Sequence, residues 1–280
     1  MFTLCSRKPS EGACLPLELP PPRHGHLPHS PLQLVACQLN YADPATPLTA
    51  AASAEVVRAL GIAGFNFPKV ETVKVASVAL SLTASGLQSA GGNPTTTAYR
   101  LLSDDGRWTV TLGPDAISLE TQRYHRWDDD FRGRFIATIG AIADQISPAV
   151  TVRIGLRYVD VFADKDVETV GGWRGKIRSE FLGPITDAAF ASGVLHTQQQ
   201  LTLEISGSLR AILRHGAFTD RDEQPSSRYL IDTDVYRETF SRFDLADVRD
   251  VLNPMHDASK QLFEYVITPE YYDQLAMAAP

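Results

Sequence analysis

Apolar and polar residues alternate along many short stretches of this chain. In residues 199–205, Leu201, Leu203 and Ile205 alternate with polar neighbours, which is typical of a strand with one buried face. The same reasoning predicts further strands over residues 32–39, 70–82, 97–102, 107–112, 117–121, 152–158, 209–214 and 229–235. Strands therefore dominate, and their hairpin-like connections indicate largely antiparallel sheets.

Two longer stretches carry apolar residues every three or four positions, which predicts amphipathic helices. The first covers residues 127–146, with the stripe Trp127, Phe131, Phe135, Ile139, Ile142 and Ile146. The second follows Asp244, with the stripe Val248, Val251, Leu252, Met255, Leu262 and Phe263. Shorter helices are expected over 53–60, with Ser53 as N-cap, over 173–182, and from Pro269 onward.

Two segments of the chain recur in the same order at similar spacing. Residues 39–43 resemble 156–160, and residues 119–124 resemble 231–236. Such self-similarity predicts an α+β fold built from a duplicated β-α-β-β-β-α module, with helices packed on one face of the sheet. The repeats would cover 32–150 and 151–280 and share one core.

Residues 1–31 differ from the rest because they are rich in proline and lack an apolar period. They are predicted to form a disordered tail. His24, His26 and His29 have the spacing of metal ligands, but chance histidines in a tail are favoured, so no metal site and no cofactor are predicted. The three cysteines all precede residue 40, which argues against a disulfide framework or a zinc ribbon.

The formal net charge of −7 argues against nucleic acid as a partner. The sequence has neither an apolar run long enough to span a membrane nor the apolar core of a secretory signal. A cytoplasmic protein that does not bind membranes is therefore expected.

Motifs of common enzymes are absent from the sequence, including a GxSxG elbow, phosphate-binding glycine loops and HExxH. This absence favours a non-catalytic protein over an enzyme. His125 could act as a general base, but its neighbours fit the start of a helix better. Tyr124 and Tyr236 occupy matching positions in the two repeats, so they are predicted to be packing anchors at helix starts.

Four charged residues are the candidate site. Arg153 and Arg157 share one strand face because alternate residues align, and they could hold a carboxylate or phosphate. Asp232 and Asp234 likewise share a face and could hold a cation or act in acid–base chemistry. For each pair, a solvated strand face or a cross-strand ion pair is the favoured alternative. With Gln198, Gln200 and Glu204, the four are expected to line a polar sheet face opposite the helices, where a partner could bind.

Three motifs make the chain similar to a known family: Pro31 to Tyr41, the central Arg153 to Asp160 segment of the form R-x-G-L-R-Y-x-[ND], and Leu230 to Asp234. The chain resembles a sporadically distributed family of uncharacterised bacterial proteins over about residues 32–272. At Asp160 the family more often has asparagine. Its patchy distribution implies an antitoxin, immunity or phage-defence accessory role, by analogy only.

Three functional hypotheses follow. The leading one is a non-catalytic protein that recognises a partner protein, encoded by a neighbouring gene, through the exposed sheet face; a homodimer is left open. The second is a small-molecule sensor with a pocket between the repeats lined by Arg153, Arg157, Asp232 and Asp234. The third is a metal- or phosphate-dependent enzyme that uses the same charged residues.

Overall fold

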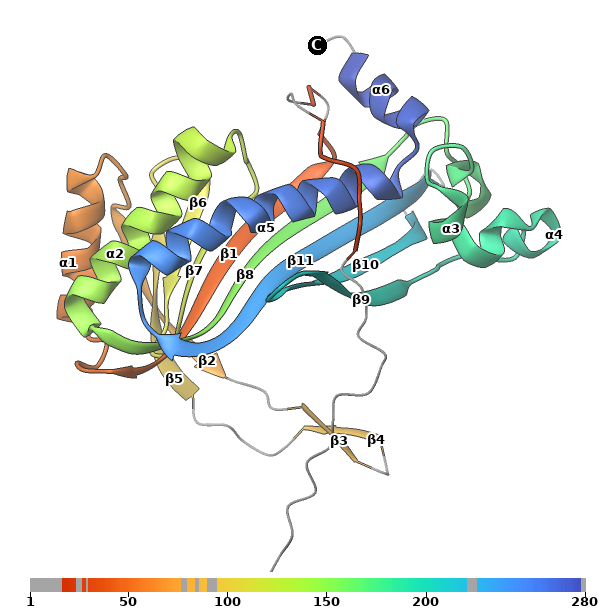
Figure 1. Ribbon diagram of the computed structural model, residues 1–280. Helices are drawn as coiled ribbons and strands as arrows, with labels where there is room; N and C mark the ends of the chain where they lie inside the picture. The colour runs from red at the N-terminus through yellow and green to blue at the C-terminus, as the bar shows by residue number, and fades with distance from the viewer. Residues whose placement is uncertain are drawn as a thin grey trace, which may run out of the picture.

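The computed structural model describes residues 17–23, 27, 28, 30–76, 80–83, 86–89, 95–220 and 226–277. A nine-stranded sheet with helices against it makes up most of this part of the chain (Figure 1). The predicted class, α+β with a largely antiparallel sheet, is confirmed. None of the helices in these ranges is long and apolar enough to cross a membrane. The histidine cluster of the predicted tail, Cys5 and Cys14 lie outside the described residues.

The strands of the large sheet follow the order β2-β5-β6-β7-β1-β8-β11-β10-β9, and all neighbours are antiparallel. Their bounds are β1 (Leu32–Pro44), β2 (Lys69–Ala76), β5 (Thr95–Leu102), β6 (Trp108–Leu112), β7 (Ala116–Thr121), β8 (Pro148–Ala163), β9 (Gln199–Ser206), β10 (Leu209–Asp220) and β11 (Ser226–Arg242). A separate hairpin joins β3 (Leu80–Thr83) to β4 (Gly86–Ser89). The single strand predicted over 70–82 is therefore divided between β2 and β3.

The helices are α1 (Ala50–Ile62), α2 (Gly133–Ile146), α3 (Ser179–Leu182), α4 (Ala188–Ala191), α5 (Leu245–Val266) and α6 (Pro269–Met277). A π-helical turn, Trp127–Arg132, leads into α2, and short 3-10 turns cover Val170–Trp173 and Gly183–Thr186. The predicted N-cap of the first helix is wrong. Thr49 caps α1 by accepting a hydrogen bond from the Ala52 N–H at 3.1 Å, because the helix begins three residues before Ser53.

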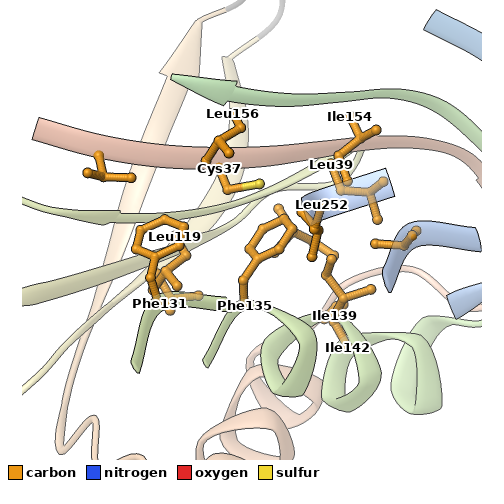
Figure 2. Close-up of a cluster of buried hydrophobic side chains, with 14 of the residues drawn as sticks. Cys37, Leu39, Leu119, Phe131, Phe135, Ile139, Ile142, Ile154, Leu156 and Leu252 are labelled. Carbon is orange, nitrogen blue, oxygen red and sulfur yellow. The ribbon is translucent and has the colours of Figure 1, made fainter. Parts of the chain in front are cut away.

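Side chains of helices α1, α2 and α5 and of the buried face of the sheet form one hydrophobic cluster. Helix α5 lies along β8 and β11 (Figure 1). The alternation predicted for β1 and β8 holds, because Cys37 and Leu39 of β1 and Leu156 of β8 all point toward the helices (Figure 2). The prediction for β9 is wrong at Leu201, which is 38% exposed at this edge of the sheet. The whole stripe predicted for residues 127–146 is buried. This cluster contains residues from both predicted repeats.

The pair β1 and β8 lies near the middle of the sheet, with four strands beyond β1 and three beyond β8. In each half the first strand lies beside the last strand of the same half, β7 beside β1 and β11 beside β8. The finer prediction for Tyr124 and Tyr236 fails, however. Tyr124 precedes the helical turn that starts at Trp127, whereas Tyr236 lies inside β11, a strand of 17 residues that ends only at Arg242. Tyr236 therefore cannot anchor a helix start.

Part of the segment predicted as a disordered tail is described and makes specific contacts. The Leu17 N–H donates to the Glu204 carbonyl of β9 at 3.0 Å, and the Arg23 guanidinium bonds Asp273 at 2.8 Å. The segment passes across α5 between these two points (Figure 1). Disorder of residues 1–31 as a whole stays a prediction.

Candidate functional site

The structure brings the four predicted site residues together on the open face of the sheet. Asp234 lies directly opposite Arg157 in the register of β11 and β8. Arg157 nevertheless reaches Asp232, which it binds through two hydrogen bonds, Nε to Oδ1 at 2.7 Å and Nη2 to Oδ2 at 2.8 Å. Arg153 donates from Nη2 to Asp234 Oδ2 at 2.9 Å. The four residues therefore form cross-strand ion pairs.

A third arginine completes this network. Arg214 of β10 lies 3.3 Å from Asp232 Oδ2 and donates from Nε to Gln200 Oε1 at 3.0 Å. The Asp232 carboxylate is 5% exposed, whereas the Arg157 side chain is 47% exposed. The carboxylate is thus held from two sides, and the charges on this face satisfy one another. Whether the four also bind a partner or ligand stays a prediction.

A cavity of about 560 Å³ lies on the opposite, helix-covered face. Its floor is formed by Tyr158 and Asp160 of β8 together with His256 and Ser259 of α5. The loop between β7 and α2 makes one wall, and the N-terminal segment at Leu27 and Pro28 makes another. Because these elements come from both halves of the chain, the cavity is a pocket between the predicted repeats, but with other residues than those expected.

Asp160 is the most unusual residue of the floor. It continues the inward-facing series of β8 after Ile154, Leu156 and Tyr158, and it is 5% exposed. Within the described part of the chain, no donor bonds its carboxyl group. Burial, together with the negative charge of Asp232, raises the pKa of Asp160 to about 8. The carboxyl group is therefore mostly protonated near neutral pH.

An aromatic and hydrogen-bonded group lies beside Asp160. Tyr158 Oη and His256 Nδ1 are 2.8 Å apart, and the Trp127 ring stacks on the His256 ring with centroids 4.4 Å apart. The indole N–H of Trp127 donates to Asn253 Oδ1 at 2.9 Å. Burial lowers the pKa of His256 to about 4, with the charge of Lys260 acting in the same direction. The imidazole is consequently neutral near pH 7.

The N-terminal segment is fastened to the wall of the cavity. The Arg23 N–H donates to Glu264 Oε2 at 2.8 Å, and Lys260 Nζ donates to the Arg23 carbonyl. The Arg23 guanidinium lies 4.3 Å above the Tyr272 ring. Burial raises the pKa of Glu264. Lys260 and Glu264 thus have structural partners, in contrast to Asp160.

Sequence reasoning missed the residues of this floor, although it had two signals. Asp160 departs from the family pattern, and its place on the apolar side of an alternating strand marks it as buried. His256 carried no signal.

Two other predicted residues lie at the cavity. The ring of Tyr124 packs edge-on against Tyr158, with ring centroids 6.1 Å apart, which fits the packing anchor predicted there. His125 lies exposed on the rim.

The polar groups of the floor are a carboxyl that is mostly protonated near neutral pH, a tyrosine hydroxyl, a neutral imidazole and a serine that donates to the Met255 carbonyl at 2.9 Å. They can donate and accept hydrogen bonds. Among the described residues, no three histidine, cysteine or acidic side chains are grouped to hold a metal ion. No protein-family model and no curated protein matches this chain.

Proposed function

We propose that this protein is a non-catalytic binding protein that holds a small molecule in the cavity between its two halves. One observation carries the proposal: the Asp160 carboxyl faces the cavity, is more than nine-tenths buried, and has no partner in the described chain. A carboxyl group that lies among buried residues and opens into a cavity is placed to bond a molecule bound there.

The size and lining of the cavity support the proposal. Pockets for small molecules usually measure about 300–1,000 Å³ and combine apolar or aromatic walls with a few polar groups. The cavity of about 560 Å³ has Trp127, Phe263 and Tyr272 in its wall and a polar floor. The bound molecule would then be in contact with elements of both halves, as a sensor requires.

Tryptophan fluorescence tests the proposal directly, because Trp127 lines the cavity. The protein is titrated with a defined panel of amines, amino acids, nucleosides and sugars, and its melting temperature is measured in parallel. At least one class is expected to raise the melting temperature and change the fluorescence. A panel that leaves both signals unchanged would count against the proposal.

A matched pair of variants locates the binding. Ser259→Phe fills the cavity, whereas Ser192→Phe makes the same change at the exposed residue that follows α4, where the Ser192 hydroxyl also donates to a carbonyl of the adjacent helix. Ser259→Phe should abolish the shift and Ser192→Phe should keep it. Equal responses of the two variants would place the binding elsewhere.

A second candidate function is recognition of a partner protein through the open sheet face. The observation in its favour is that this face carries exposed charges, such as Arg210 and Glu238, whose side chains are 58% and 61% exposed. Strand β2 also leaves an edge to which a partner strand could add, whereas the edge of β9 already accepts a hydrogen bond from the Leu17 N–H. Co-purification with the products of neighbouring genes, compared between the wild type and Arg210→Glu, tests it; a chain that stays alone would rule it out.

The biological role is also a proposal. Both functions, binding of a small molecule and recognition of a partner protein, are compatible with a cytoplasmic location and with a homodimer. Both are also compatible with an antitoxin, immunity or phage-defence accessory role, which rests on the family resemblance alone. Duplication of one module is supported by the pairing of the first and last strands in each half, β1 with β7 and β8 with β11. The unequal connections of the two halves show that any duplication has since diverged.

A further inference from the structure

Asp160 and Asp232 are the buried carboxyl groups of the described chain, and they are satisfied in different ways. Asp232 has two arginines, Arg157 and Arg214, within hydrogen-bonding distance. Asp160 faces the cavity instead. A buried carboxylate needs a cation or several hydrogen-bond donors. The described residues supply neither to Asp160, so we look for them in a molecule bound in the cavity.

Elsewhere in the chain, carboxylates that lie near an aromatic ring are paired with a cationic side chain that also contacts the ring. Among the described residues, a cation lies between the two in four places: Arg153 with Asp234 and Tyr236, Lys176 with Asp164 and Tyr271, Arg23 with Asp273 and Tyr272, and Arg134 with Asp130 and Trp108. The cation–carboxylate distances are 2.9, 2.7, 2.8 and 3.0 Å. The cation-to-ring distances are 4.8, 4.7, 4.3 and 4.4 Å. Asp160 also lines a cavity that has aromatic rings in its wall, but no cation of the described chain pairs with it.

Other occupants fit less well. An anionic group would be repelled once Asp160 ionises, and Asp232 behind the sheet adds to that repulsion. A metal ion lacks the cluster of further ligands that it needs among the described residues. Lys260, the cationic residue of α5 in the cavity wall, is held by the Arg23 carbonyl.

We propose that the small molecule bound in the cavity presents a cationic nitrogen group, an amine, amidine or guanidine, to the Asp160 carboxylate, with the aromatic wall around it. This inference rests on the proposed function and narrows it to one chemical class. A cation offers both the charge and the N–H donors that a buried carboxylate lacks.

Binding of a cation should then be coupled to loss of a proton. The ion pair requires ionised Asp160, whose pKa is about 8 in the free cavity. Affinity should therefore rise about tenfold between about pH 6 and about pH 7 and level off above about pH 8.

Other groups around the cavity could also contribute to a pH dependence. The loop between β7 and α2 brings Arg123, Tyr124, His125, Arg126 and Asp128. The strand and helices bring Tyr158, His256, Lys260, Glu264 and Tyr272. His256 has a pKa of about 4 and stays neutral in this range, and burial raises the pKa values of Tyr124, Tyr158 and Tyr272. Asp160→Asn separates the remaining contributions from that of Asp160.

Three probes of one shape and different charge test the inference: benzamidinium, benzamide and benzoate. Each is titrated into the full chain at about pH 8 and constant ionic strength, with Trp127 fluorescence and ligand-observed NMR as readouts. Benzamidinium should bind at least about tenfold more tightly than benzamide, the range expected for a hydrogen bond to a charged group. Benzoate should bind most weakly.

Asp160→Asn keeps the shape of the side chain and removes its charge. This variant should lose about tenfold or more of the affinity for benzamidinium, keep its affinity for benzamide within about threefold, and lose the pH dependence. The charge-matched control Asp250→Asn, on the exposed side of α5 outside the cavity, should change the affinity for benzamidinium by less than about threefold.

The possible outcomes are distinct. If benzamidinium does not bind up to its solubility limit, or binds no better than benzamide, the inference is wrong. Equal affinity of the wild type and Asp160→Asn for benzamidinium overturns it as well. In those cases the proposed function still stands if another class in the defined panel binds and Ser259→Phe prevents it. If neither the panel nor the probes bind, both proposals fail.

Discussion

Asp160 and Asp232 lie on neighbouring strands, each about one-twentieth exposed, but on opposite faces of the sheet. On the open face, Arg157 and Arg214 enclose the Asp232 carboxylate. On the helix-covered face, Asp160 opens into the cavity. The open face therefore uses its charges to hold strands β8, β10 and β11 together, whereas the cavity keeps one polar group free. Charged residues that are conspicuous in a sequence can thus be structural, while a single carboxyl on an apolar face marks the site that we propose.

The largest expected effect is on the open face. Asp232→Asn leaves two arginines facing each other without their anion, so it should lower the free energy of unfolding by about 3 kcal/mol at about pH 7. Urea unfolding followed by circular dichroism measures it. Glu238→Gln, in the exposed pair with Arg210, is the control and should change stability by less than about 0.5 kcal/mol. Equal effects would mean that the network does not hold the strands together.

The next largest effect concerns Asp160 and has an unusual dependence on pH. Its pKa is about 8 in the folded protein, above the value near 4 of an unfolded chain. Stability from the protonated group is therefore fully present below about pH 4 and is lost as pH rises toward about 8. Relative to Asp160→Asn, the wild type should lose roughly 2–3 kcal/mol between about pH 5 and about pH 7.

Urea unfolding of both proteins at the two pH values checks this prediction. The difference between the two proteins removes the contribution of all other titrating groups. Parallel stability curves would show that Asp160 ionises at an ordinary pH and finds a partner in the protein.

A smaller effect tests the hydrogen bond beside Asp160. Tyr158→Phe removes the hydroxyl that bonds His256 Nδ1 and should lower the free energy of unfolding by about 1–2 kcal/mol. Tyr265→Phe, at a tyrosine that is 37% exposed, should cost less than about 0.5 kcal/mol. Thermal unfolding distinguishes the two. A variant at Tyr158 as stable as the control would mean that this bond does not organise the floor.

The parts of the fold that follow from local pattern could be predicted from the sequence. The spacing from Trp127 to Ile146 defines an apolar stripe without knowledge of its partner, and the alternation around Arg153 and Arg157 assigns them to one face. Helix boundaries were less accurate, because Thr49 and Ser53 are both good caps and only the tertiary context chooses between them. The length of β11 also had no local signal, which is why Tyr236 was assigned to a helix start.

The candidate site depends on contacts between distant parts of the chain. Tyr158 and His256 are 98 residues apart, and no local pattern predicts their hydrogen bond. Asp160 could have been found, because it continues the series Ile154, Leu156 and Tyr158 on the buried face of β8. Its lack of a partner, however, depends on the packing of α5 and the N-terminal segment around it, which the sequence does not reveal.

We propose that the functional site is the cavity at Asp160 and not the charged face at Asp232. A crystal structure of the protein grown with saturating benzamidinium tests this most directly. We predict the amidinium nitrogens within about 3 Å of the Asp160 carboxylate, with the ring among the aromatic side chains of the cavity wall. Benzamidinium bound on the open face beside Asp232 or Asp234, with the cavity empty, would contradict the account.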